Sequence, residues 1–238
     1  MIEVRGLTKL YGPVEAVRDL SFTVTPGEVL GLVGPNGAGK TTTLRSIVGI
    51  VRPTEGAIRV GGHELDREPV AAKRLLAFMP DEPHLFEYLT VEEHLQFTGR
   101  LYQVADVQRR IPALLEELEL SEKAGVLPGE LSRGMKQKLV IACGLLHDPR
   151  ALLFDEPLTG LDPAGIRRMK QTIRDRAHQG AAVVLSSHLL HLVEEICTRV
   201  LIMKRGRKVA LGTIDDILSE RPDLRGQSLE DIFLTLTA

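Results

Sequence analysis

The feature that most constrains the fold of this chain is a glycine-rich segment that follows a short apolar run. Residues 34–41 read Gly-Pro-Asn-Gly-Ala-Gly-Lys-Thr and match the pattern G-x-x-x-x-G-K-[ST]. Residues 29–33 are continuously apolar, as in a strand covered on both faces, and residues 41–51 have a helical pattern. Glycines in such a loop let backbone N–H groups converge on phosphate oxygens, and the following helix adds the positive end of its dipole. The sequence therefore predicts a nucleoside triphosphate site, with Lys40 on the phosphates and Thr41 on Mg²⁺.

Two further apolar runs extend the same architecture. Residues 151–154 and 181–185 are continuously apolar, and a helical pattern over residues 163–178 separates them. This alternation of strand and helix indicates a three-layer α/β fold with a mainly parallel sheet. The phosphate loop alone does not separate ATPases from GTPases or small-molecule kinases.

The rest of the chain predicts other kinds of structure. Residues 2–5, 21–24 and 57–60 alternate apolar and polar positions, which is typical of an antiparallel sheet with one wet face. Residues 200–211 are interpreted as a hairpin. The tail is expected to form an amphipathic helix packed on its own domain, because apolar residues recur at helical spacing at Leu229, Ile232, Phe233 and Leu236.

A long helical stretch interrupts the strand alternation between residues 90 and 147. We interpret it as a helical subdomain inserted into the α/β core. The expected organisation is a single domain over residues 1–238, in which residues 1–84 and 148–238 form the core and residues 85–147 form the insert.

Polar residues that end the predicted strands suggest the second half of the site. Asp155 and Glu156 follow an apolar strand, and ligands bind at the carboxyl ends of parallel strands. Asp155 could hold Mg²⁺ and Glu156 could polarise the attacking water, although two acids in a solvated turn would look the same. His188 follows the next strand and could sense the γ-phosphate, or open a surface helix. Ser132, with Gly134 two residues later, could present donors to an anion or simply cap a helix.

Composition excludes two classes of protein. Thirty basic and 32 acidic residues give a net charge of −2, which argues against a basic nucleic-acid surface. The longest uncharged apolar run, residues 139–146, is far shorter than the roughly 20 residues of a membrane-spanning helix. The first residues have no apolar signal-peptide segment, so an intracellular protein is expected.

Together these motifs resemble the ATP-binding subunits of ATP-binding cassette (ABC) transporters, in the family's order and over nearly the whole chain. The resemblance identifies the loop at 34–41 as Walker A, residues 131–135 as the signature motif, residues 152–156 as Walker B and His188 as the switch histidine. It implies a P-loop NTPase (RecA-like) fold, with an N-terminal antiparallel part, and Mg²⁺-dependent hydrolysis of ATP.

The resemblance also implies a role for each site residue. Glu156 would be the general base, with His188 and Lys40 as catalytic partners. Mg²⁺ would be held by Thr41 and Asp155, and Asp81 would engage Mg²⁺ or a water molecule. Tyr11 would stack on adenine. The other residues expected on the nucleotide are Gly34, Asn36, Gly37, Ala38, Gly39, Thr42, Ser132 and Gly134.

Three features distinguish this chain from the usual family pattern: two departures in the motifs and one cue to a subgroup in the tail. The signature motif has Arg133-Gly134-Met135 where Gly-Gly-Gln is usual, and we expect the Arg133 side chain to be solvated. Asp81 stands where the family has a glutamine before the helical insert, and its carboxylate accepts hydrogen bonds without donating them. The tail from Gln227 to Ala238 is similar to that of drug, antibiotic or polysaccharide exporters.

The resemblance finally implies partners. Ser132 and Gly134 would contact ATP held by a second ATPase subunit, in a dimer around two ATP molecules. Separate transmembrane permease subunits would dock near residues 85–89 and hold the chain on the cytoplasmic face of the membrane, without direct membrane insertion. The expected direction of transport is export. Local core packing is the alternative for residues 85–89. The alternative functions are a soluble ABC ATPase of translation or DNA maintenance, and a regulator that binds nucleotide without hydrolysis.

Overall fold

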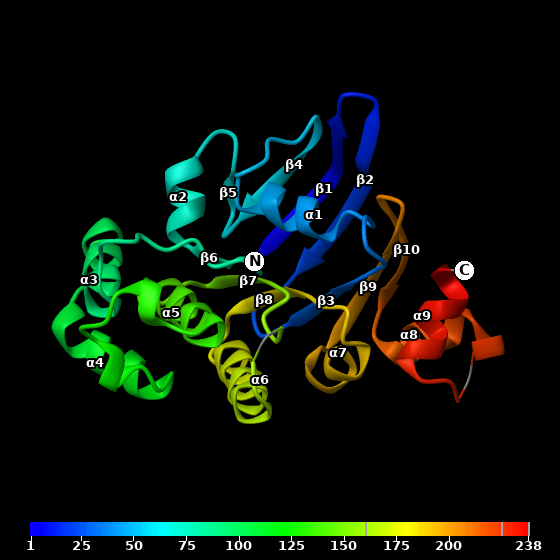
Figure 1. Ribbon diagram of the computed structural model, residues 1–238. Helices are drawn as coiled ribbons and strands as arrows, with labels where there is room; N and C mark the ends of the chain where they lie inside the picture. The colour runs from blue at the N-terminus through cyan, green and yellow to red at the C-terminus, as the bar shows by residue number, and fades with distance from the viewer. Residues whose placement is uncertain (160, 225, 238) are drawn as a thin grey trace.

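A six-stranded sheet forms the centre of the computed structural model, which describes residues 1–159, 161–224 and 226–237 (Figure 1). Its strand order is β10-β9-β3-β8-β7-β6. All neighbours are parallel except β10, which pairs antiparallel with β9. The strands are β3 (Val29–Val33), β6 (Leu76–Met79), β7 (Ala151–Asp155), β8 (Ala182–Ser186), β9 (Arg199–Lys204) and β10 (Arg207–Gly212). The predicted parallel core and hairpin are confirmed, whereas β6 was not predicted as a strand.

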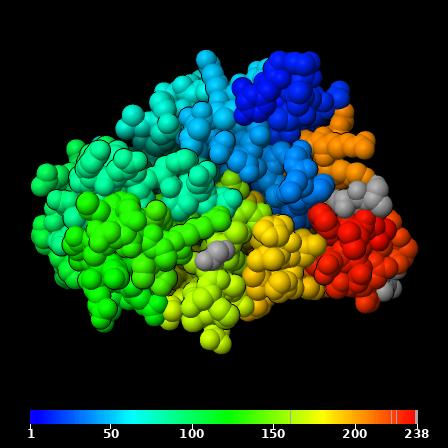
Figure 2. All heavy atoms as spheres, viewed as in Figure 1, coloured from blue at the N-terminus to red at the C-terminus, as the bar shows by residue number. Residues whose placement is uncertain are grey.

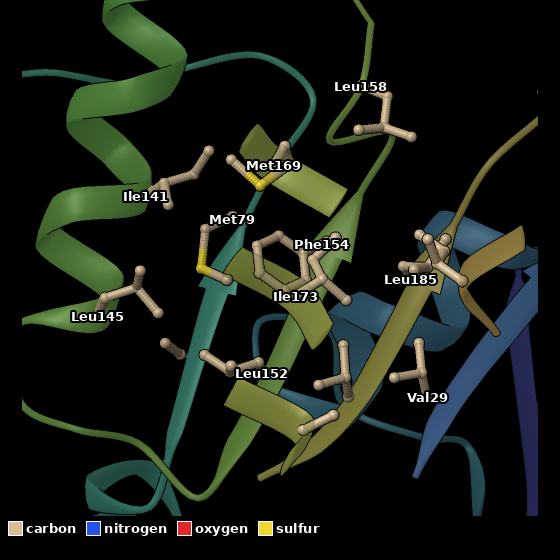
Figure 3. Close-up of a cluster of buried hydrophobic side chains, with 14 of the residues drawn as sticks. Val29, Met79, Ile141, Leu145, Leu152, Phe154, Leu158, Met169, Ile173 and Leu185 are labelled. Atoms are coloured by element: carbon tan, nitrogen blue, oxygen red, sulfur yellow. The ribbon is translucent and has the colours of Figure 1, made fainter. Parts of the chain in front are cut away.

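Both faces of this sheet are covered, which explains the continuous apolar runs in its strands. Val29 and Val33 of β3 belong to one buried cluster, which includes residues of α6 (Pro163–His178) and α7 (Leu190–Ile196). Figure 3 shows Phe154 of this cluster beside Met169 and Ile173, with Leu185 on the neighbouring strand. The alternate residues Leu30 and Leu32 face a second cluster, built with α1 (Lys40–Ile47) and the other sheet.

That other sheet is antiparallel and has the strand order β2-β1-β4-β5. Its strands are β1 (Ile2–Tyr11), β2 (Val14–Val24), β4 (Glu55–Val60) and β5 (His63–Glu64), and α2 (Pro69–Arg74) follows. The predicted antiparallel arrangement is confirmed, and the first two strands are longer than their alternating segments. Their hairpin turn brings Tyr11 to the level of the phosphate loop, where both border one pocket.

The helical stretch lies at one end of the molecule, where Figures 1 and 2 show it in green. It contains α3 (Val91–Leu101), α4 (Val107–Glu117), the short 3₁₀ turns η1 (Ser121–Lys123) and η2 (Pro128–Glu130), and α5 (Arg133–Leu145). Local sequence sets two of the starts, because Thr90 and Glu93 form a capping box on α3 and Ser132 caps α5. In Figure 3, Ile141 and Leu145 of α5 point toward Met79 of β6.

The chain ends in α8 (Ile214–Glu220), the turn η3 (Pro222–Leu224) and α9 (Leu229–Thr237), drawn in red at the opposite end from the green helices (Figure 2). Leu229 and Ile232 are buried, and Phe233 and Leu236 pack against the same cluster. The expected tail helix on its own domain is therefore confirmed, while residue 238 lies outside the described part. In the described residues no helix is both long and apolar enough to cross a bilayer.

Candidate nucleotide-binding site

The phosphate loop connects β3 to α1, and its glycines have conformations that other residues rarely adopt. Gly37 and Gly39 have φ values of 78° and 101°. A Cβ atom on Gly39 would also lie only 2.5 Å from the carbonyl oxygen of Ala16. The motif glycine at 39 is therefore required both by its backbone angle and by the strand that passes beside it.

Lys40 begins α1 and folds over the loop. Its ammonium donates hydrogen bonds to the carbonyl oxygens of Gly34 at 2.6 Å and Pro35 at 3.3 Å. Burial lowers the pKa of Lys40, and the nearby carboxylates of Glu156 and Asp155 act in the opposite direction. The loop thus holds a cation where a triphosphate would contribute negative charge.

A pocket of about 700 Å³ opens over the loop. This volume is within the range of roughly 300–1,000 Å³ that is usual for ligand sites. It brings together eleven residues singled out from the sequence: Tyr11, Asn36, Gly37, Ala38, Gly39, Lys40, Thr41, Thr42, Asp81, Asp155 and Glu156. Its remaining lining residues are Val14, Glu15, Ala16 and Arg205.

Oxygen atoms gather at one edge of the pocket. The Thr41 hydroxyl donates to Asp155 Oδ1 at 3.3 Å, and the Ser186 hydroxyl donates to the same oxygen at 2.6 Å. The described residues contain no cluster of three or more His, Cys, Asp or Glu that would enclose a metal ion. Such an open set of hard oxygen donors nevertheless fits Mg²⁺, which usually takes one or two carboxylates and completes its shell with water and substrate phosphates.

Glu156 lies beside that edge, and its backbone and carboxylate are held by hydrogen bonds with Ser186 and His188. Its φ of 51° is in the left-handed region, where a non-glycine residue stores about 1 kcal/mol or more. Its backbone N–H donates to the carbonyl oxygen of Ser186 at 3.1 Å and to the Ser186 hydroxyl at 3.2 Å. His188 contacts the carboxylate through Nδ1 at 2.8 Å and through its backbone N–H at 3.3 Å. A carboxylate held in this way can orient a water molecule.

Tyr11 stands at the rim of the pocket with 47% of its surface exposed. The ammonium of Lys9 lies 5.0 Å from the centre of its ring. An exposed ring above a phosphate loop is available for stacking on a flat base.

Ser132 and Gly134 do not line this pocket. They belong to the start of α5, where the Ser132 hydroxyl accepts a hydrogen bond from the backbone N–H of Met135 at 3.3 Å. Arg133 is exposed, as expected from the sequence, but it also pairs with Asp81 at 3.4 Å. Ser132 and Gly134 therefore lie outside the nucleotide pocket of their own chain. Gly34 and His188 do not line the pocket either, but they bond Lys40 and Glu156, which do.

Sequence reasoning missed five residues of the site: Val14, Glu15 and Ala16 near Tyr11, together with Ser186 and Arg205. Ser186 bonds both Asp155 and Glu156, and its position at the end of an apolar strand was the available signal. Arg205 reaches the pocket from the turn between β9 and β10, which the sequence indicated only as a hairpin tip.

Comparison with known proteins gives a consistent result. The sequence profile described as "ABC transporter" matches residues 17–159. The ABC-type transporter ATP-binding protein EcsA of Bacillus subtilis (strain 168) is 34% identical, over 100% of this chain and 96% of the relative. The Nod factor export ATP-binding protein I of Paraburkholderia xenovorans (strain LB400) is 40% identical, over 89% of this chain and 70% of the relative. A solved ATP-binding subunit of an ABC transporter superposes with a TM-score of 0.95 at 38% identity and covers both chains completely.

Proposed function

The chain belongs to the ABC transporter family as an ATP-binding subunit that hydrolyses ATP, and on this premise we propose how its own residues perform the reaction. Glu156 is the general base that polarises the attacking water, and His188 keeps its carboxylate in place. Lys40 neutralises charge on the phosphates, assisted by Gly34 and the backbone from Asn36 to Thr42. Tyr11 stacks on the adenine. The observation that carries this proposal is the joint lining of one pocket by the loop, Tyr11, Asp155 and Glu156.

We propose that Mg²⁺ is held by Thr41 and Asp155, with Asp81 beside them. The bound ion supplies charge neutralisation on the phosphates. Ser186 keeps Asp155 ready for this task, because its hydroxyl donates to the carboxylate oxygen that also receives the Thr41 hydrogen bond. The described residues alone offer an incomplete shell, which phosphate oxygens and water would complete.

A second copy of the ATPase subunit completes each site in this proposal. Ser132 and Gly134 lie at the N-terminus of α5 and outside the pocket of their own chain. The Ser132 hydroxyl accepts a hydrogen bond from Met135, and its own hydrogen can still be donated. A helix N-terminus with such a donor suits an anion, so Ser132 and Gly134 of one chain would contact the triphosphate held by the other. Two ATP molecules would then join two antiparallel chains, and hydrolysis would let the two chains separate.

The helical end supports docking to a membrane permease. A cavity of about 230 Å³ lies between α3, α5 and the segment before α3, and Phe86 and Phe97 form part of its wall. Phe86 and Tyr88 are 57% and 87% exposed. Exposed aromatic side chains around a groove suit a short helix from a transmembrane subunit. We assign residues 85–147 as a helical subdomain of the single domain 1–238 for this reason, since it carries both Ser132 and the groove.

The direction of transport follows from the relatives. The Nod factor relative is an export ATP-binding protein by name, and we propose export for this chain as well. The chain would work on the cytoplasmic face of the membrane, held there by its permease. The alternatives, an ABC ATPase without a membrane partner and a nucleotide switch that does not hydrolyse, have no specific support in the site.

Two measurements test these proposals. Purified chain should hydrolyse ATP in the presence of Mg²⁺, and Lys40→Ala should abolish turnover.

The permease proposal is tested by co-expression with the product of a neighbouring gene that has about six membrane-spanning segments. This partner should move the chain into the membrane fraction. Replacing Phe86 and Tyr88 by Ser should release it from that fraction while leaving ATP binding intact. A chain that stays in the supernatant with every such neighbour would contradict the transport proposal.

A further inference from the structure

Two side chains of α5 hold the segment that follows β6. The Arg133 guanidinium donates to Asp81 Oδ1 at 3.4 Å, and the Gln137 side-chain amide donates to the carbonyl oxygen of Pro80 at 3.2 Å. Arg133 and Gln137 are four residues apart and therefore share one face of the helix. Gln137 is only 3% exposed, so its hydrogen bond is protected from water. Consecutive turns of α5 thus contact consecutive residues of one loop.

The same helix is also closely packed on β6. A Cβ atom on Gly144 of α5 would lie 2.7 Å from the sulfur of Met79, which indicates a close approach of helix and strand. Figure 3 shows Ile141 and Leu145 against Met79 from the same side. Helix α5 therefore packs on β6 and also hydrogen-bonds the two residues that follow it, Pro80 and Asp81. These contacts limit where Asp81 can lie.

Asp81 lies between two hollows of the surface. It lines the nucleotide pocket together with Thr41 and Asp155, and it also lines an outer depression together with Arg133 and Lys136. Its side chain is 48% exposed and that of Arg133 is 62% exposed. A carboxylate in this position faces the carboxylates of Asp155 and Glu156 on one side and a guanidinium on the other.

We propose that Arg133 is a positioning residue for Asp81, and that their ion pair sets how the Asp81 carboxylate meets the metal edge of the nucleotide site in the same chain. This inference rests on the proposed function, because it takes Asp81 to be a neighbour of the bound Mg²⁺. Without the Arg133 guanidinium, the Asp81 carboxylate would be repelled more strongly by the carboxylates of Asp155 and Glu156 and by the triphosphate. The guanidinium offsets this repulsion and orients the carboxylate through a charge-assisted hydrogen bond.

The arrangement has a consequence for the proposed dimer. Arg133 is the first residue of α5, directly after Ser132, which is proposed to contact the nucleotide of a second copy. A movement of the α5 N-terminus in response to one nucleotide would therefore move Arg133, and with it Asp81 at the other nucleotide.

The test is a double-mutant cycle on ATP binding by the full chain. Calorimetry would use a non-hydrolysable ATP analogue, so that turnover contributes no heat. It would measure the dissociation constant of this analogue with Mg²⁺ and with EDTA for wild type, Asp81→Asn, Arg133→Gln and the double variant. Lys136→Gln is the matched control, because it removes the same charge from the same depression. Among the described residues, Lys136 has no ion-pair partner within 4.0 Å, whereas Arg133 pairs with Asp81. Thermal unfolding of each variant would verify folding.

The Arg133 and Lys136 variants are expected to differ in their affinity for ATP with Mg²⁺. Asp81→Asn should weaken binding of ATP with Mg²⁺ about tenfold, the low end for groups around a metal. Arg133→Gln should weaken it about two- to fivefold beyond Lys136→Gln, as expected for one exposed ion pair, and Arg133→Lys should recover part of the loss. In EDTA, Arg133→Gln and Lys136→Gln should behave alike. The double variant should bind more weakly than Asp81→Asn by no more than the loss measured for Lys136→Gln.

Additive losses in the cycle would overturn the proposal, because Arg133 would then act independently of Asp81. Equal losses for Arg133→Gln with Mg²⁺ and with EDTA would also overturn it. The proposed function fails differently, through a wild-type chain that binds ATP with Mg²⁺ but does not hydrolyse it. The two failures are distinguishable because the cycle measures binding alone.

Discussion

Oε2 of Glu156 lies 2.8 Å from Nδ1 of His188, and the same oxygen accepts the backbone N–H of His188 at 3.3 Å. The two residues follow different strands, β7 and β8, which are neighbours in the sheet. The His188 side chain is 58% exposed and that of Glu156 is 17% exposed, so an exposed histidine contacts a largely buried carboxylate. The orientation of the proposed base therefore depends on the position of the segment after β8.

Glu156→Gln should keep ATP binding, abolish turnover and accumulate an ATP-bound dimer. Glutamine has the same size but cannot accept a proton, and loss of a general base typically costs about 10²–10⁴-fold in rate. Phosphate release and size-exclusion chromatography with ATP would measure the two effects. Glu55→Gln is the control, because Glu55 is exposed at the start of β4, outside the site. Normal hydrolysis by Glu156→Gln would assign the base elsewhere.

His188→Ala should lower turnover by about 10- to 100-fold without weakening ATP binding. The variant removes the ring contact but leaves the backbone N–H contact with Glu156 in place, so the loss should be smaller than for Glu156→Gln. His191→Ala, an exposed histidine of α7, is the matched control. Turnover should be followed at saturating ATP for both variants. Equal turnover of the two variants would exclude the positioning role of His188.

The parts of this fold that could be predicted from sequence depend on local signals. The buried strands β3, β7 and β8 carry continuous apolar runs because both of their faces are covered, and the glycine spacing of the loop is a backbone requirement. Strand β6 has only four residues, and its pairing with β7 makes it a strand. No local pattern indicates such a pairing.

Contacts within the site were less predictable for the same reason. Asp81 and Arg133 are 52 positions apart, and their pairing depends on how α5 packs on β6. Arg205 reaches the pocket only because β9 pairs with β3 and carries the hairpin tip to the phosphate loop. Sequence patterns identified the residue types that the chemistry needs, whereas long-range packing determines which of them meet.

Ser132→Asp should abolish turnover while ATP binding by the isolated chain stays within about twofold. Aspartate is as good a helix cap as serine, so α5 should keep its start, but its charge would repel a triphosphate held by a second copy. Thr90→Ala, which removes the cap of α3, is the control for a destabilised helix start. Its turnover should be near normal, whereas its stability should fall by about 1 kcal/mol. Full turnover by Ser132→Asp would contradict the assignment of Ser132 to a second site.

Gly39→Ala should destabilise the chain by about 3 kcal/mol or more and remove measurable ATP binding. The new methyl group combines a φ of 101° with a 2.5 Å approach to the carbonyl oxygen of Ala16, so the loop must shift. Gly37→Ala has a φ of 78° but no atom within 4 Å of the new Cβ, so it should lose only about 1–2 kcal/mol. Denaturant unfolding and ATP titration would compare the two. Equal stability losses would show that the steric contact at Ala16 is unimportant.

His147 should make the stability of the helical end sensitive to acid. Its ring stacks on Tyr102 with centres 3.8 Å apart, Nε2 donates to the carbonyl oxygen of Leu76 at 3.2 Å, and Nδ1 is buried without a partner. Burial lowers its pKa below the ordinary 6.5, partly opposed by the Leu76 hydrogen bond. The stability that the neutral ring contributes is therefore complete above pH 6.5. It is lost as the pH falls through 6.5 toward the lower pKa of the folded chain, because the unfolded chain takes up the proton first.

His147→Phe keeps an aromatic ring on Tyr102 but cannot titrate, and it loses the Leu76 hydrogen bond. At pH 8 the variant should be less stable than wild type by about 1 kcal/mol, the usual net value of such a bond. Between pH 6.5 and 5 that difference should shrink or change sign, because only wild type bears the free-energy cost of protonating a buried ring. Denaturant unfolding at pH 8, 6.5 and 5 would measure it, and effects of other groups cancel between the two proteins. A difference that stays constant with pH would mean that His147 titrates normally in the folded chain, and that its unpartnered Nδ1 is accessible to water.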